Sequence, residues 1–132
     1  MYLLDTNICI ALMNGDRLAI QAFNRLFPQC YASTIVIAEL YKGIYGSQRQ
    51  SENLNALNDL TQLLEVVSFS TEAALEFGLI QNELKQIGRP TGELDSLIGA
   101  VARSRGDILV THNTRDFENI PNLQLERSEE RR

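Results

Sequence analysis

Apolar residues recur along the chain with two different periods. Two short apolar runs, Tyr2–Leu4 and Ile108–Val110, each end in a polar segment, which is typical of buried strands followed by turns. Weaker strand candidates lie at 30–32, 66–67 and 123–125. Longer segments carry apolar residues at spacings of three and four, which predicts helices over 7–13, 16–27, 34–46, 50–64, 71–87 and 93–105.

Residues that commonly begin and end helices support these limits. Ser33-Thr34 and Ser70-Thr71 can cap helix starts, and glycines stand where three of the helices should end, at Gly46, Gly88 and Gly106. Strands and helices alternate throughout the chain. This alternation predicts an α/β fold of three layers, with a parallel sheet of about four to five strands and helices on both faces.

Size and composition predict a single domain over 1–132. The 132 residues are 44% apolar, and we expect only 126–132 to form a frayed tail. A core of this size needs neither a disulfide nor a structural metal, so we expect Cys9 and Cys30, both in apolar surroundings, to be reduced. The first residues lack the pattern of a signal peptide, and no run is long enough to span a membrane, so we expect a cytoplasmic protein.

The charge balance is acidic, with 17 acids against 12 bases and a net charge of −5. That sign disfavours a nucleic-acid partner, because phosphate contact is chiefly electrostatic. Two features weaken the objection. Ten of the twelve bases are arginine, which suits phosphate contact, and a divalent metal could cancel the charge of some of the acids.

Polar residues follow both of the clearest strand candidates. In a parallel sheet, ligands bind beyond the carboxyl ends of the strands, and Asp5 and the segment Thr111–Asp116 occupy that place. Asp116 lies in a polar turn to which Thr111 and Asn113 add neutral oxygen atoms. Alternatives remain open at this point, since Asp5 could simply cap a helix and Asp116 could be a surface turn acid.

Two further acids belong to predicted apolar helices. Glu39 lies one turn into the helix over 34–46 and should be partly buried, although Lys42 at i+3 offers an ordinary ion-pair partner. Asp95 lies in the opening turn of the helix over 93–105, where the helix dipole favours anions. Glu93 competes for that capping role. We assign Glu93 to solvent and Asp95 to the site, while the reverse assignment stays open.

Three or four carboxylates together form the oxygen ligand set that Mg²⁺ and Mn²⁺ prefer. Such an ion can lower the pKa of bound water and stabilise the leaving oxygen of a phosphodiester. Catalysis then needs no histidine. His112, the only histidine, should point away from Thr111 and Asn113 if the strand period continues, and we expect no catalytic role for it.

Four segments of the chain resemble PIN-domain toxins of the VapC type. They are Leu3-Leu-Asp5-Thr-Asn, the helix that carries Glu39, Gly92-Glu-Leu-Asp95-Ser-Leu-Ile-Gly-Ala, and Leu109-Val-Thr-His-Asn-Thr-Arg-Asp116-Phe. The resemblance implies a Mg²⁺- or Mn²⁺-dependent endoribonuclease whose metal is held by Asp5, Glu39, Asp95 and Asp116. It implies a homodimer silenced by a VapB-type antitoxin, as the toxin of a type II toxin–antitoxin system. It also implies transfer RNA cut at the anticodon loop, with initiator tRNA as the leading substrate.

The resemblance also carries over a set of supporting residues. They are expected to support the site or contact RNA: Thr6, Thr111, Asn113, Arg115 and Arg89. His112 and Glu93 depart from the family pattern. His112 stands where relatives carry another polar residue, and Glu93 is an additional acid beside Asp95.

Three other functions fit parts of the pattern. A PIN ribonuclease that works in RNA processing without an antitoxin would share the same four acids. An inactive PIN fold kept as a binding scaffold is disfavoured because all four acids remain. A phosphoreceiver module should carry a lysine at the end of a late strand, but Lys42 and Lys85, the only lysines, fall in predicted helices.

Overall fold

The computed structural model of the chain describes residues 1–128. Its centre is one sheet of five parallel strands in the order β3-β2-β1-β4-β5. The strands are β1 (Tyr2–Leu4), β2 (Cys30–Ser33), β3 (Glu65–Val67), β4 (Ile108–Thr111) and β5 (Gln124–Arg127). Along the chain, β2 and β3 are added on one side of β1, and β4 and β5 are then added on its other side. The strand order therefore reverses between β1 and β4, where ligands bind in open α/β sheets.

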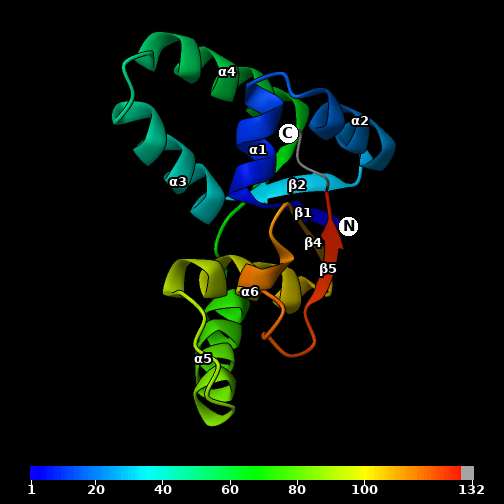
Figure 1. Ribbon diagram of the computed structural model, residues 1–132, viewed down its shortest axis with the longest axis vertical. Coiled ribbons are helices and arrows are strands. Elements are labelled where there is room, and N and C mark those ends of the chain that lie inside the picture. Colours follow the sequence, from blue (N-terminus) through cyan, green and yellow to red (C-terminus); the bar gives the residue numbers. More distant parts are fainter. Residues whose placement is uncertain (129–132) are drawn as a thin grey trace.

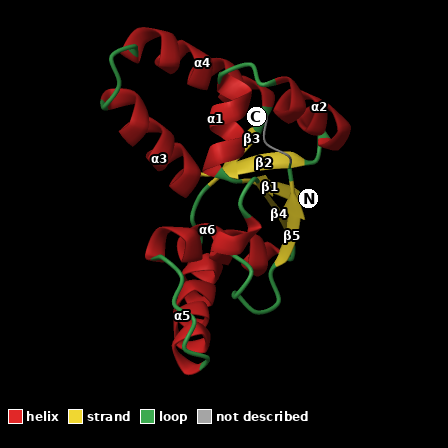
Figure 2. Cartoon of the chain, in the orientation of Figure 1, coloured by secondary structure: helices red, strands yellow, loops and turns green. Residues whose placement is uncertain are grey.

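Helices cover both faces of this sheet (Figures 1 and 2). One layer holds α1 (Thr6–Met13), α2 (Arg17–Leu26), α3 (Thr34–Tyr45) and α4 (Gln50–Leu63). The other holds α5 (Thr71–Gln86) and α6 (Glu93–Arg105), which pack against each other. A single 3₁₀ turn, η1 (Thr114–Asp116), follows β4. The predicted three-layer α/β fold is confirmed, with every expected strand and helix present.

Local hydrogen bonds explain where several helices begin and end. The hydroxyl of Ser33 accepts a hydrogen bond from the amide of Val36 (3.3 Å), and that of Ser70 accepts one from Ala73 (3.1 Å). Gly106 ends α6 in the left-handed conformation, with φ of 68°, which a residue with a Cβ rarely adopts. Because Ser33 is both the last residue of β2 and the cap of α3, the helix that carries Glu39 begins directly at the carboxyl end of β2.

The last strand corrects one expectation. The predicted frayed tail began at Glu126, but Glu126 and Arg127 belong to β5, which pairs with β4. The amide of Ser128 then donates a hydrogen bond to the carbonyl of Thr111 (2.9 Å). Pairing with β4 satisfies backbone groups that a tail would expose to water, and it orders this segment. Residues 129–132 of the expected tail lie outside the described residues.

The core lies on both sides of the two central strands. Leu3, Leu4, Leu109 and Val110 are fully buried, and so is Tyr31 on β2. Cys9 and Cys30 are buried free thiols, as expected, and burial raises the pKa of Cys9 to about 12. Among residues 1–128, no helix is both long and apolar enough to cross a membrane.

A close approach at Gly99 brings the loop after η1 against α6. A Cβ at Gly99 would lie 2.9 Å from Cδ1 of Ile120, so a larger residue there would force the Ile120 side chain to move. Phe117 and Ile120 of that loop are buried. The packing brings the segment that carries Asp116 toward the helix that carries Asp95.

Candidate active site

Asp5 lies at the point where the strand order reverses. Its amide donates a hydrogen bond to the carbonyl of Val110 (2.9 Å), which ties it to the neighbouring strand. Its carboxylate accepts two hydrogen bonds, from the amide of Thr6 (2.8 Å) and the hydroxyl of Thr111 (2.7 Å). The side chain is only 6% exposed. Asp5 is thus the N-cap of α1 and also a buried carboxylate at the reversal of strand order, so its role as a cap does not exclude a role in a site.

Burial makes the charge of Asp5 costly. It raises the pKa of Asp5 above the ordinary value of 3.8, and the donors Thr111 and Thr6 oppose that rise. The negative charges of Glu39 and Asp116 raise it further. A buried carboxylate in the field of other carboxylates is stabilised by a cation.

The hydroxyl of Thr111 has a fixed direction. Its oxygen faces two donors, the amide of Asn113 (3.1 Å) and the side-chain nitrogen of Asn7 (3.5 Å). Its hydrogen is therefore free to donate to Asp5, and the 2.7 Å distance is that of a strong hydrogen bond to an ionised acceptor. Thr111 holds the Asp5 carboxylate in one orientation.

Asn7 belongs to the same hydrogen-bond network, although the sequence pattern did not predict a role for it. Its side-chain oxygen accepts a hydrogen bond from the amide of His112 (3.3 Å), and its nitrogen faces Thr111. It therefore links the start of α1 to the end of β4. The sequence hint was an asparagine two residues after Asp5. Its hydrogen-bond partner, His112, lies more than a hundred residues away in sequence, so no local pattern connects the two.

We predict that Asn7→Ala weakens the site without unfolding the chain. Residues that orient metal-binding groups typically contribute about 10- to 100-fold to metal affinity or activity, and we expect a loss in that range. The measurement is RNA cleavage as a function of divalent-ion concentration, beside a thermal melt. Asn82→Ala, an exposed asparagine of α5, is the matched control. An unchanged metal dependence in Asn7→Ala would contradict the prediction.

Glu39 approaches Asp5 through Thr6. The hydroxyl of Thr6 donates a hydrogen bond to Oε1 of Glu39 (2.8 Å), and the Glu39 side chain is partly buried, as expected. Lys42, the alternative partner, is exposed and forms no ion pair with Glu39 in the part of the chain that the structure describes. Thr6 therefore contacts two carboxylates, through its amide to Asp5 and its hydroxyl to Glu39.

Asp95 lies in the same electrostatic field. Burial, and after it the charges of Asp116, Asp5 and Glu39, raise its pKa from 3.8 to about 6. Glu93, the competing acid of the same helical turn, is exposed. Asp116 is exposed in η1, where the side-chain nitrogen of Asn113 donates to its Oδ2 (3.1 Å). The fold thus brings together four acids that are up to 111 residues apart in sequence.

The chemistry of these donors fits a hard divalent cation. All four are carboxylates, and their mutual repulsion is one cause of the raised pKa of Asp95. They form a loose group, because among residues 1–128 no three acidic, histidine or cysteine side chains come close enough to hold a metal ion directly. Mg²⁺ commonly keeps several water ligands and needs only one or two carboxylates, so a loose group suits it.

Two of the expected site residues are arginines on the surface. Arg89 is exposed in the loop that leads to α6, and Arg115 is exposed in η1 beside Asp116. Neither is held in an ion pair within residues 1–128, so both remain available to a phosphate. The ring nitrogen Nε2 of His112 is buried and has no hydrogen-bond partner among the described residues, so no group positions it as a base.

Comparison with known proteins agrees with this fold. A family model described as the PIN domain matches residues 2–123. The chain is therefore a PIN domain. A tRNA(fMet)-specific endonuclease VapC of Shigella flexneri is 36% identical over 126 residues, which cover 95% of this chain and 96% of the relative. Ribonuclease VapC1 of Haemophilus influenzae is 37% identical over 127 residues, 94% of this chain and 95% of the relative.

Solved structures give the same result. VapBC2 from Rickettsia felis, solved bound to a DNA fragment from its promoter, superposes with a TM-score of 0.90 at 33% identity and covers 96% of this chain and 97% of that one. DNA-bound VapBC from Salmonella typhimurium superposes with a TM-score of 0.89 at 36% identity, over 95% and 96% of the two chains. The chain belongs to the VapC ribonucleases of the PIN-domain family. This confirms the expected family and removes the phosphoreceiver alternative.

Proposed function

We propose that this chain is a divalent-metal-dependent endoribonuclease, the toxin of a VapBC-type pair, which acts in the cytoplasm with Mg²⁺, or Mn²⁺ in its place. The observation that carries the proposal is that Asp5 after β1, Asp116 after β4, Glu39 of α3 and Asp95 of α6 lie in one electrostatic field. Membership in the VapC ribonucleases supports it. We also propose that residues 1–132 form one domain and that the active protein is a homodimer.

The four acids would hold the metal, which supplies an activated water and stabilises the leaving oxygen of the phosphodiester. The residues around them keep the site in order. Thr111 fixes the direction of the Asp5 carboxylate, and Thr6 connects Asp5 to Glu39. Asn113 holds Asp116, while Arg89 and Arg115 would guide phosphates of the RNA.

We propose initiator tRNA, cut at the anticodon loop, as the substrate. The relative from Shigella flexneri is named as specific for tRNA(fMet), and it aligns with 95% of this chain. Sequence-specific recognition of RNA mostly targets single-stranded loops, and the anticodon loop of a tRNA is one.

Cleavage of total bacterial RNA by the purified chain tests the activity and the substrate together. We expect discrete cuts with Mg²⁺ or Mn²⁺, loss of all cuts in EDTA, and mapped ends within the anticodon loop of initiator tRNA. Metal-dependent cuts elsewhere would retain the nuclease and reject the substrate. No cleavage with either metal would favour the inactive scaffold, and an Mg²⁺ titration without binding would establish it.

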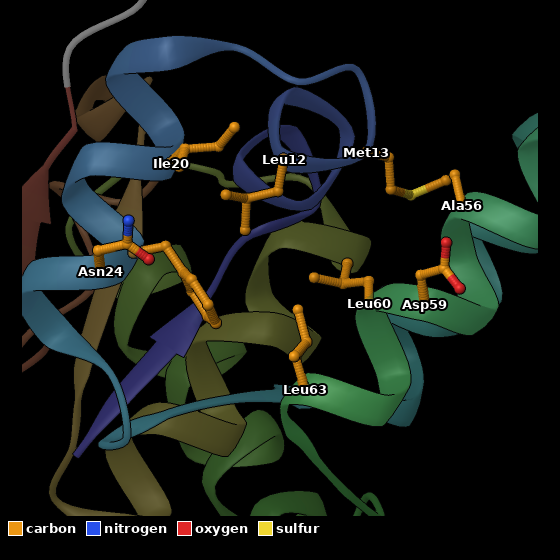
Figure 3. A pocket seen from close by; sticks show the side chains of 9 residues that line it. Leu12, Met13, Ile20, Asn24, Ala56, Asp59, Leu60 and Leu63 are labelled. Atoms are coloured by element: carbon orange, nitrogen blue, oxygen red, sulfur yellow. The ribbon is translucent and has the colours of Figure 1, made fainter.

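An apolar groove supports the antitoxin partner (Figure 3). It has a volume of about 320 Å³ and lies between α1, α2 and α4. Its apolar lining includes Leu12, Met13, Ile20, Phe23, Leu60 and Leu63. Leu63 is 57% exposed, although apolar side chains of this size are usually buried. We propose that an apolar segment of the VapB-type antitoxin occupies this groove, since relatives are solved as VapBC complexes.

Leu63→Glu should weaken antitoxin binding and leave RNA cleavage by the free toxin intact. Loss of one buried leucine costs about 1.5–3 kcal/mol, which corresponds to roughly tenfold or more in affinity. Ile87→Glu, at a residue 55% exposed outside the groove, is the control. Titration calorimetry measures the affinity of each of the two variants for the antitoxin. Equal affinities for the two variants would place the antitoxin elsewhere.

The alternative, a PIN ribonuclease without an antitoxin, would share the metal site but not this partner. A short neighbouring gene that encodes a DNA-binding antitoxin would identify the chain as the toxin of a pair and exclude this alternative. Sedimentation of the purified chain, alone and with that gene product, tests the homodimer in the same experiment.

A further inference from the structure

The chain that follows Asp116 lies against one face of α6. Residues 117–123 form turns between η1 and β5, so they lack the repeating hydrogen bonds that fix a helix or a strand. Two of their side chains approach Gly99 closely: a Cβ there would lie 2.9 Å from Ile120 and 3.4 Å from Leu123. The position of these turns, and of Asp116 directly before them, therefore depends on contacts with α6.

Arg103 of α6 makes a polar contact with the same turns. Its Nη1 donates hydrogen bonds to the carbonyl of Pro121 (3.0 Å) and to Oε2 of Glu83 (2.7 Å), and its Nε donates to Oε2 of Glu76 (2.7 Å). The side chain is only 10% exposed. A guanidinium presents its donors in a rigid planar fork, so acceptors on several sides fix its position. Arg103 thus joins the turns to α6 and, through the two glutamates, to α5.

The contacts with the turns lie on the side of α6 that carries Asp95. Asp95, Gly99 and Arg103 follow one another at intervals of four residues. Residues with this spacing differ by about 40° around the helix axis and about 6 Å along it, so the three lie on one side of the helix. After burial, the charge of Asp116 is the largest cause of the raised pKa of Asp95. The turns that Arg103 holds therefore begin at the acid that acts most strongly on Asp95.

We infer that Arg103 is a positioning residue of the acidic site: it holds the turns 117–123 against α6 and thereby fixes the place of Asp116 relative to Asp95. The inference rests on the proposed metal site and adds to it a residue outside the carboxylate group. Arg103 acts through the carbonyl of Pro121. Residues that orient metal ligands typically contribute about 10- to 100-fold to metal affinity, and we expect about tenfold from a residue that acts through the backbone.

A purely structural role for Arg103 would be to join α5 to α6 through its ion pairs with Glu76 and Glu83. Both glutamates belong to α5, whereas Pro121 belongs to the turns. The two roles therefore use different partners and can be separated by substitution. The double variant Glu76→Gln/Glu83→Gln removes both negative charges, and each amide oxygen can still accept a hydrogen bond from Arg103. It keeps the contact with Pro121 and serves as the matched control.

The test adds Arg103→Met to this double variant and measures Mn²⁺ binding to the folded chain by electron paramagnetic resonance, without RNA. We expect the double variant to bind Mn²⁺ as the wild-type chain does, and the triple variant to bind it about tenfold more weakly. Hydrogen exchange gives a second readout that needs no metal. The amides of Phe117 and Ile120, which donate to carbonyls of η1 and of the turns, should exchange faster in the triple variant than in the double variant.

Equal Mn²⁺ affinity in the double and triple variants would overturn the inference and leave Arg103 as a link between two helices. If the wild-type chain binds no Mn²⁺ and cuts no RNA, the proposed function fails, and hydrogen exchange alone decides: faster exchange at Phe117 supports the positioning role, and unchanged exchange overturns it. If the triple variant does not fold, Arg103→Lys in the wild-type chain replaces it. Lysine keeps the charge but lacks the fork, so it should weaken Mn²⁺ binding in the same direction, and unchanged binding would overturn the inference.

Discussion

Replacement of Asp5 with asparagine is expected to abolish RNA cleavage while the domain remains folded. Partners that only orient a metal ligand contribute about 10- to 100-fold, so loss of the central carboxylate should reduce kcat by at least about a hundredfold. The amide keeps an oxygen that can accept from Thr6 and Thr111. It also removes a buried charge whose pKa is raised by burial, so the metal-free chain should unfold at an equal or higher temperature.

Single-turnover cleavage with Mg²⁺ and Mn²⁺, beside a thermal melt without metal, measures both effects. Glu52→Gln is the control, since Glu52 is an exposed carboxylate that pairs with Arg49 on the surface. Cleavage by Asp5→Asn at the rate of the control would reject the metal site. A large fall in melting temperature would instead show that Asp5 is chiefly a structural cap of α1.

Asp95→Asn should give the second large loss of cleavage, and Glu93→Gln should not. The two acids belong to one turn of α6, but Asp95 is partly buried in the field of Asp116, Asp5 and Glu39, whereas Glu93 is exposed. We expect a loss of at least about a hundredfold for Asp95→Asn, as for Asp5→Asn, and near-normal rates for Glu93→Gln. The opposite result would exchange the roles of the two acids.

The raised pKa of Asp95 predicts that the stability of the metal-free chain depends on pH. The pKa of Asp95 is about 6 in the folded chain and ordinarily 3.8, so protonation favours the fold. That stabilisation is fully present below about 3.8 and is lost as the pH rises through about 6. The free energy of unfolding should therefore fall by on the order of 1–2 kcal/mol between low pH and pH 7, once solvent screening of this partly exposed group is considered.

Urea unfolding in EDTA at pH 4, 5, 6 and 7 measures this dependence in the wild-type chain and in Asp95→Asn. The difference between the two curves isolates Asp95 from other acids, such as Asp107, whose pKa is lowered and which acts in the opposite direction. Mg²⁺ should restore stability at pH 7 in the wild-type chain only. Parallel curves would show that Asp95 is not coupled to the cluster.

Local sequence patterns were sufficient for most of the fold. Apolar runs and helical spacing predicted the five strands and six helices because each depends on residues only a few positions apart. Ser33 and Ser70 act as the predicted caps for the same reason. The segment from Glu126 was wrongly expected to be a tail, because its order comes from pairing with β4 rather than from its own composition.

The sequence by itself determined the types of residue at the site, and four acids at the starts of helices or after strands indicated a divalent metal. Only the tertiary structure decided how they are connected. Thr6 contacts two carboxylates, Thr111 donates to Asp5 from another strand, and Asn7 joins two segments that are distant in the chain. Such contacts depend on strand order and on the packing of helices over the sheet. No local sequence pattern predicts these contacts, because the partners meet only when the central strands pair.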